Sequence, residues 1–396
     1  MTRLSERISS VRPSATIAVT SRAKQMQAEG IDVVSFGAGE PDFDTPEFIK
    51  AAAVAALDAG DTKYTPKQGN ALKQAIADKL ASENNLPYAP DQIAVTFGGK
   101  HALYDAFQVL LDPGQKVLIP SPYWVSYPEM VKLAGGEPVF LPAGPEDGFK
   151  IKPQQILDAA GEAKILVVNS PANPTGVSYT PEELQAIAEA VLQTDLMVFS
   201  DEIYEKLIYG QTRFVSFASL DKRLMERTVT FNGLAKTFAM TGWRIGWAAG
   251  PKKVIKGIGS LMSHETTNPV SFVQAAALAA YTCPQAAKAV ETMREEFEKR
   301  GLHMAKRLNA IDGVSCVQPT GAFYCFPDIS THYGRTLGNV KVSDSLTFAQ
   351  AALETANVAL VPGVAFGEDR CVRLSFATSM EQIDKGLDRL EQLLAR

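Results

Sequence analysis

The chain is poor in the residues that build metal centres, disulfide scaffolds and membrane anchors. Its 396 residues include four cysteines and four histidines, and neither set has the spacing of metal ligands, so we expect no metal site and buried, unpaired thiols. No apolar run is long enough to cross a bilayer, and the first residues lack the apolar core of a secretion signal. The net charge of -5 includes no basic stripe. These absences predict a cytoplasmic protein that binds neither membranes nor nucleic acids.

The middle of the chain alternates short β-rich runs with helical stretches. With 46% hydrophobic residues, a chain of this length can bury more than one core. Such alternation is typical of a mostly parallel sheet flanked by helices. The strands predicted for this sheet are residues 93–96, 117–119, 165–168, 196–201, 228–231 and 246–249. The fold class that follows is α/β.

Helix signals and a second group of strands divide the chain further. The Thr-Pro-Glu-Glu sequence at 180–183 is a capping box with proline at the first helical position. Other helices are expected after Pro46, over residues 284–311, and after Ser379. Further strands are expected at 323–326, 358–361 and 372–376. We predict an N-terminal arm with part of the small domain (1–45), a large domain (46–285) and a small α+β domain (286–396).

One lysine, Lys236, lies among small and apolar residues directly after a predicted buried strand. Such surroundings disfavour its charged form, and the neutral amine can condense with an aldehyde. Arg244 follows where a guanidinium could hold a phosphate, and Asp201 ends a neighbouring strand. Taken singly, such a lysine is more often a surface residue and such an aspartate a helix cap. Together, an amine, a phosphate-binding arginine and a carboxylate for a pyridinium nitrogen match the needs of pyridoxal phosphate.

Two glycine-containing turns help to distinguish between possible functions. Gly98 and Gly99 follow a predicted strand, where their amides could approach a phosphate. The Gly-Ala-Gly at 37–39 is followed by Glu-Pro-Asp instead of a third glycine and a helix, which argues against a nicotinamide-dependent dehydrogenase. No segment remains for the DNA-binding domain of a regulator that binds pyridoxal phosphate. Arg373 lies inside an apolar strand, where a guanidinium needs an anion.

These motifs resemble a known family. The segment from Gly233 through Lys236 to Gly246 is similar to the pyridoxal-lysine signature of class I aminotransferases, and the segments 121–124 (Ser-Pro-Tyr-Trp) and 173–176 (Asn-Pro-Thr-Gly) resemble two further blocks of it. The resemblance covers essentially the whole chain and is greatest to the bacterial type of aspartate aminotransferase, some members of which also act on prephenate. It implies fold type I: a large domain with a mostly parallel seven-stranded sheet flanked by helices, and a smaller α+β domain.

The resemblance also implies roles around the pyridoxal ring. Lys236 would form the covalent link to the cofactor and move the substrate proton. Asp201 would keep the pyridine nitrogen protonated, and Tyr204 and Asn173 would hydrogen-bond the phenolic oxygen of the ring. Trp124 would stack on the ring face.

The phosphate and the substrate carboxylate would be bound at the two ends of the site. Arg244 and the amides of Gly99 and Lys100 would hold the phosphate, together with Tyr64 from the neighbouring subunit of a homodimer. Arg373 would bind the α-carboxylate as a bidentate pair, helped by Asn173 and the Gly39 amide. The resemblance places both the Ser121-Pro122 and Asn173-Pro174 bonds in tight turns, and we expect both to be cis.

The expected reaction is ping-pong transamination from aspartate or glutamate to a 2-oxo acid such as 2-oxoglutarate. The resemblance assigns the distal carboxylate of the substrate to Lys100, aided by Ser14 and Thr16 of the arm. Arg12 could contribute to prephenate binding. Lys100 could instead be only a cation near the phosphate, and prephenate or aromatic amino acids remain alternative substrates.

Overall fold

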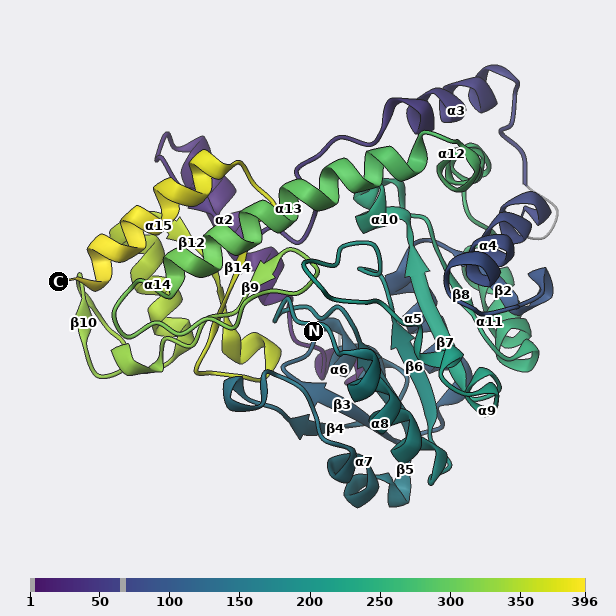
Figure 1. Cartoon of the computed structure of the whole chain (residues 1–396), viewed down its shortest axis with the longest axis horizontal. Coiled ribbons are helices and arrows are strands. Elements are labelled where there is room, and N and C mark those ends of the chain that lie inside the picture. Colours follow the sequence, from purple (N-terminus) through teal and green to yellow (C-terminus); the bar gives the residue numbers. More distant parts are fainter. Residues whose placement is uncertain (1–3, 65–68, 396) are drawn as a thin grey trace.

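The computed structural model describes residues 4–64 and 69–395, and its largest layer is a seven-stranded sheet. In spatial order the strands are β2 (Ile93–Thr96), β8 (Gly246–Ala249), β7 (Thr228–Gly233), β6 (Met197–Asp201), β5 (Ala163–Asn169), β3 (Lys116–Ser121) and β4 (Glu137–Pro142). Strand β8 is antiparallel to both neighbours and the other pairs are parallel (Figure 1). The expected mostly parallel seven-stranded sheet is therefore confirmed. Strand β4 was not among the predicted strands.

Helices pack against both faces of this sheet, which explains its nearly continuous apolar strands. Successive residues of β5 and β6 point to opposite faces: Val167 and Phe199 pack with α5 (Gly99–Leu110) and α11 (Lys252–Glu265). Leu166 and Val198 pack on the other face with α7 (Pro153–Ala159) and α8 (Pro181–Leu192). The sheet is thus the middle of three layers.

Two predicted helix starts are confirmed in atomic detail. The Thr180 hydroxyl accepts the Glu183 amide at 3.2 Å, and the Glu183 carboxylate accepts the Thr180 amide at 2.7 Å, so α8 begins with a capping box. Ser379 likewise accepts the Gln382 amide at 3.2 Å at the start of α15 (Met380–Leu394).

The long helix α13 (Ala286–Leu308) leads from the sheet to a second group of elements near the C-terminus (Figure 1). This group contains a three-stranded antiparallel sheet in the order β13 (Val361–Pro362), β14 (Val372–Ser375), β9 (Tyr324–Cys325), with α14 (Ser345–Ala356) and α15 around it. Strand β1 (Val34–Ser35) pairs with β12 (Val358–Ala359), so the N-terminal segment joins this group. The domain boundaries at 45 and 285 stay a prediction.

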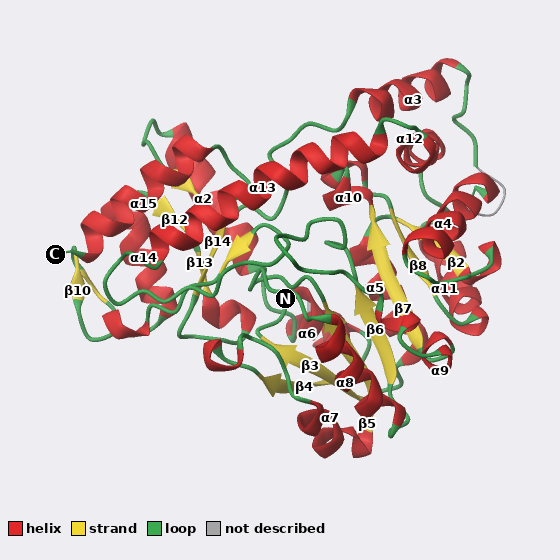
Figure 2. Ribbon diagram, viewed as in Figure 1, coloured by secondary structure: helices red, strands yellow, loops and turns green. Residues whose placement is uncertain are grey.

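One strand prediction in this group was wrong. The run 358–361 forms two short strands in different sheets, because β12 pairs in parallel with β1 whereas β13 pairs antiparallel with β14. The remaining α-helices and strands are α1 (Glu6–Ser9), α2 (Ala15–Ala28), α3 (Glu47–Asp58), α4 (Asn70–Glu83), α6 (Ser126–Leu133), α9 (Lys222–Met225), α10 (Leu234–Thr237), α12 (Ser271–Thr282), β10 (Thr336–Leu337) and β11 (Val340–Lys341). Figure 2 labels these elements except α1 and β11.

Three smaller predictions can be compared with the structure. The Ser121-Pro122 and Asn173-Pro174 bonds are cis, as expected, and Ser170-Pro171 is a third cis bond that was not predicted. All four cysteines are unpaired, and three of them are buried while Cys283 is partly exposed. Within the described residues, none of the helices combines the length and apolar character needed to traverse a bilayer.

Candidate active site

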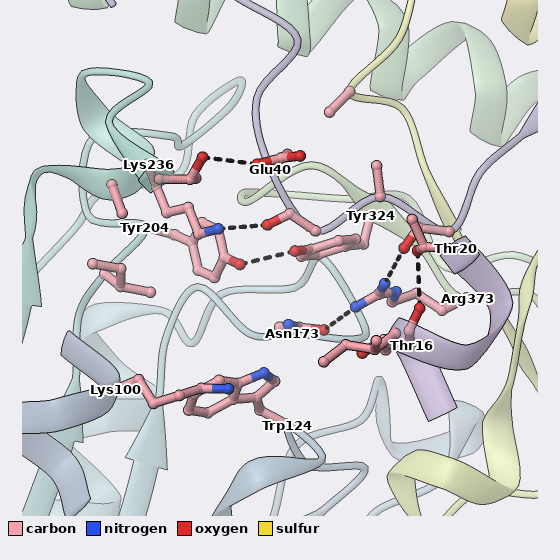
Figure 3. A pocket seen from close by; sticks show the side chains of 18 of the residues that line it. Thr16, Thr20, Glu40, Lys100, Trp124, Asn173, Tyr204, Lys236, Tyr324 and Arg373 are labelled. Carbon is pink, nitrogen blue, oxygen red and sulfur yellow. Dashed lines mark hydrogen bonds between the residues drawn. The ribbon is translucent and has the colours of Figure 1, made fainter. Parts of the chain in front are cut away.

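A cavity of about 750 Å³ lies where the sheet, the N-terminal segment and β14 meet (Figure 3). Strands β5, β6 and β7 end at this cavity, as expected for a parallel sheet, whose ligands bind beyond the C-terminal strand ends. Most of the predicted site residues line it: Thr16, Gly39, Gly99, Lys100, Trp124, Asn173, Asp201, Tyr204, Lys236, Arg244 and Arg373. Residues far apart in the sequence thus form one site.

Lys236 supplies a primary amine at the centre of this cavity. It lies in the single turn of α10, directly after β7, and its Nζ donates a 2.5 Å hydrogen bond to the carbonyl of Gly39. Burial lowers the pKa of Lys236 to about 8, and the charges of Arg373, Arg244 and Lys100 act in the same direction against the opposing effect of Glu40. A neutral, nucleophilic amine is therefore accessible near neutral pH.

Asp201 presents a buried carboxylate at the end of β6. Its Oδ2 accepts a 2.6 Å hydrogen bond from the Tyr127 hydroxyl, and its Oδ1 accepts the Ile203 amide at 3.3 Å. Burial raises the pKa of Asp201 to about 6, although both hydrogen bonds and Lys236 favour the charged form. A positive charge bound next to this carboxylate would therefore compensate the cost of burying its negative charge.

A phosphate-sized cradle forms at the N-terminus of α5. Gly98 has a φ of +93°, and a Cβ there would lie 2.7 Å from the Arg244 guanidinium. Arg244 is held from behind, since it donates to the carbonyls of Thr241 at 2.8 Å and Phe97 at 3.2 Å. The amides of the first helical turn have no partners within a helix and carry the positive end of its dipole. Cradle and guanidinium together fit an anion.

A second anion site surrounds Arg373 on β14. The guanidinium is 2% exposed and donates to Asn173 Oδ1 at 3.0 Å and to the Gly37 carbonyl at 2.9 Å. Its centre lies 4.6 Å from the ring of Tyr324. Among the described residues, its Nε has no hydrogen-bond partner and no carboxylate lies within ion-pair distance. Because burial lowers the pKa of Arg373, its charge calls for an external carboxylate.

Aromatic and cationic side chains lie between these two ends. The Lys100 Nζ lies 4.9 Å from the centre of the Trp124 ring, which in turn contacts Tyr127 edge to face. Burial, followed by the charge of Arg244, lowers the pKa of Lys100. The hydroxyls of Tyr204 and Tyr324 are 2.9 Å apart (Figure 3). One wall of the cavity is thus aromatic and carries a cation for which the described residues offer no ion-pair partner.

Some residues that line the cavity were not predicted from the sequence as site residues. Tyr127 and Tyr324 have the contacts just described, and Asn169 donates to the Asp201 carbonyl at 3.0 Å while accepting the Asn173 amide at 3.0 Å. Asn169 directly follows the predicted strand 165–168 and ends β5, so a polar residue at that position was the signal that could have found it.

Three predicted residues do not line the cavity of this chain. Tyr64 is 84% exposed. The Arg12 amide donates to Glu129 at 3.1 Å, and the Ser14 hydroxyl is 2.8 Å from that of Thr16, which does line the cavity. The roles assigned to Tyr64, Arg12 and Ser14 stay predictions.

Comparison with known proteins identifies the class. Residues 31–390 match the family described as aminotransferase class I and II, and the chain belongs to this family. It is 48% identical over 396 residues to the aspartate aminotransferase of Bacillus subtilis, covering 100% of this chain and 99% of that protein. It is 47% identical over 400 residues to the aspartate/prephenate aminotransferase of Cereibacter sphaeroides, with 100% and 99% covered.

Comparison with solved structures identifies the same class of protein. The aspartate aminotransferase from Rhizobium meliloti superimposes with a TM-score of 0.96 at 38% identity, covering 100% of both chains. The Thermus thermophilus aspartate aminotransferase with maleate superimposes with a TM-score of 0.93 at 44% identity, again covering 100% of both. The family depends on pyridoxal phosphate. The cavity fits this cofactor because it offers an amine at Lys236, a buried carboxylate at Asp201 and the glycine cradle beside Arg244.

Proposed function

We propose that this enzyme is an aspartate aminotransferase, which moves an amino group from aspartate or glutamate to a 2-oxo acid such as 2-oxoglutarate in a ping-pong reaction. The observation that carries the proposal is one cavity with a reactive amine, Lys236, and a buried guanidinium, Arg373, that has no carboxylate partner. The names of the relatives support the choice of aspartate. A cytoplasmic location is part of the same proposal.

Pyridoxal phosphate, when bound, supplies an electron sink for the carbanion at the substrate Cα. Asp201 would keep the pyridine nitrogen protonated, and Tyr127 orients that carboxylate through its 2.6 Å hydrogen bond. Arg244 and the first-turn amides of α5 would hold the phosphate, and Trp124 would pack against the ring. Lys236 would hold the cofactor covalently and would move the proton at the substrate Cα.

The substrate is oriented by its carboxylates. Arg373 takes the α-carboxylate as a bidentate partner, and Asn173 fixes the guanidinium by accepting from it at 3.0 Å. Lys100, next to Trp124, takes the distal carboxylate of a dicarboxylic amino acid. Prephenate is the alternative acceptor, and the relatives named aspartate/prephenate aminotransferase support it.

The covalent link is the direct test of this proposal. Wild-type protein should be yellow, and borohydride should fix pyridoxal phosphate to Lys236, as read by peptide mass spectrometry. Lys236→Ala should abolish both the link and transamination, because the variant loses the amine of the turn that directly follows β7. A reducible link that persists in the variant would sink the assignment.

We further propose a homodimer whose sites are shared, with Tyr64 reaching the phosphate of the partner. Its 84% exposure in the single chain agrees with a side chain that finds its contact elsewhere. Mixing the inactive variants Tyr64→Ala and Arg373→Ala should restore activity to some hybrid dimers, because one site of each hybrid keeps both residues. Subunit exchange, followed by mass spectrometry, without any returning activity would contradict shared sites.

A further inference from the structure

Three titratable side chains cluster directly behind the phosphate-binding turn. His101 and Asp105 lie one turn apart on α5, and Glu265 ends α11. The His101 Nε2 is 3.1 Å from a Glu265 oxygen and 3.4 Å from an Asp105 oxygen. On its other side, His101 Nδ1 accepts the backbone N–H of Phe97 at 3.4 Å, and the two rings meet edge to face.

These contacts assign the ring proton. Since Nδ1 accepts the Phe97 N–H, the proton of a neutral imidazole is on Nε2, where it points to the carboxylates. The three side chains could in principle hold a metal ion, because their ligand atoms lie within 4.8 Å of one another. A metal on Nε2, however, would need the proton on Nδ1, facing the Phe97 N–H. The geometry therefore favours a hydrogen-bonded cluster over a cation site.

The backbone of Phe97 connects this cluster to the cofactor site. Its N–H donates to His101, and its carbonyl, in the next peptide group, accepts the Arg244 guanidinium at 3.2 Å. We propose that His101 is a positioning residue that fixes the backbone of Phe97, and through it the phosphate-binding turn and Arg244. The proposal rests on the assignment of that turn to the cofactor phosphate.

The position of His101 in the helix supports this role. With Gly98 as the N-cap of α5, His101 is the third helical residue. From that position a glutamate or glutamine reaches back to a backbone N–H in a capping box. Here His101 reaches the N–H of Phe97, one residue before the N-cap. A Cβ at Gly98 would lie 2.7 Å from the Arg244 guanidinium, so the N-cap cannot carry a capping side chain without displacing Arg244.

Glu265 is the carboxylate that orients the imidazole. Its oxygen is the nearer acceptor for Nε2, at 3.1 Å against 3.4 Å for Asp105. Asp105 is fully buried, and neither of its oxygens has a hydrogen-bond partner among the described residues. Burial and the nearby Glu265 raise the pKa of Asp105, which disfavours its charged form. Asp105→Asn should accordingly leave the function of His101 intact.

The test compares two ligands that differ only in the phosphate. Dissociation constants of pyridoxal phosphate and of pyridoxal are measured by absorbance for the full-length enzyme freed of its cofactor. His101→Phe, which keeps the ring shape but removes both nitrogens, should lower the preference for pyridoxal phosphate about 5- to 30-fold. His101→Asn should retain most of the preference, because its Oδ1 can replace Nδ1 as acceptor. His303→Phe is the matched control, since His303 also bonds a carboxylate, at 2.6 Å, but lies on α13.

Each outcome decides the question. An equal weakening of both ligands in His101→Phe, or an unchanged preference, overturns the proposal. So does stoichiometric Zn²⁺ binding by the wild type, in equilibrium dialysis with Zn²⁺ alone, that His101→Phe abolishes. If His101→Phe does not fold, Glu265→Ala should lower the preference about 2- to 5-fold and Glu265→Gln should restore it; no change in Glu265→Ala overturns the proposal. Failure of the wild type to bind pyridoxal phosphate would instead refute the cofactor assignment itself.

Discussion

Two buried cations of this enzyme have opposite surroundings. Lys79 on α4 forms an ion pair with the buried Glu205 and donates to Asn84 at 2.7 Å, while Asn84 also donates to Glu205 at 2.9 Å. Arg373 is buried as deeply, yet its partners are an amide oxygen and a carbonyl. Within the described chain, Lys100, Lys236 and Arg244 also have no carboxylate at ion-pair distance.

The difference between the surroundings of Lys79 and Arg373 distinguishes a structural cation from one that binds a ligand. A buried charge is unfavourable unless a counter-charge and hydrogen bonds compensate it. Lys79 has its compensation within the chain, and it therefore holds α4 against the segment after β6. Arg373 has no such counter-charge among the described residues, which agrees with the proposal that a substrate carboxylate compensates it. A buried cation without an ion-pair partner thus points to a ligand site, and a paired one points to the core.

The comparison predicts the largest effect at the paired cation. Lys79→Met leaves the buried Glu205 carboxylate without its ion-pair partner, which should lower the free energy of unfolding by about 3–5 kcal/mol. Urea denaturation measures this change. The double variant with Glu205→Met should recover much of the loss, because it removes both charges. A double variant as unstable as the single one would show that the pair itself is unimportant.

At Arg373 we expect a large loss of activity without a loss of stability. Arg373→Met should lower kcat/KM for every amino acid about 30- to 5000-fold, because the α-carboxylate loses its buried partner. The stability of the cofactor-free protein should stay the same or increase, since an uncompensated charge is removed. Steady-state kinetics measures the loss of kcat/KM, and urea denaturation of the same preparation measures the stability. A strongly destabilised variant would mean that Arg373 is structural.

A smaller and more selective effect is expected at Lys100. Lys100→Ala should lower kcat/KM for aspartate and glutamate about 30- to 1000-fold while sparing alanine and phenylalanine. The reason is that only dicarboxylic substrates offer it a counter-charge. Equal losses for both groups would assign Lys100 to the phosphate instead.

The sequence predicted what is local and missed what depends on distant contacts. Asp201 ends a buried strand, and Gly99 and Lys236 lie three residues beyond the ends of two others, so the sequence around each residue indicates its position. The 2.6 Å bond from Tyr127 joins it to Asp201 across 74 residues, and Tyr204 meets Tyr324 across 120. No local pattern encodes such a pairing.

The missed strand β4 has a different explanation. Its sequence Glu-Pro-Val-Phe-Leu-Pro contains two prolines, and it pairs with β3 alone at the edge of the sheet. Proline removes a ladder donor and is tolerated at edges, so a sequence-based reading rejects such a run as a strand. The helix over 284–311 was found because its amphipathic pattern is long, although it ends earlier, at Leu308.

The short segment from Gly37 to Gly39 contacts both the guanidinium of Arg373 and the amine of Lys236. The carbonyl of Gly37 accepts from Arg373, and that of Gly39 accepts from Lys236. Two extended residues span at most about 7 Å, so covalent bonds limit how far apart the amine and the guanidinium can be held. The positions of both groups therefore depend on one stretch of backbone. A change in the conformation of this stretch would displace the amine and the guanidinium together.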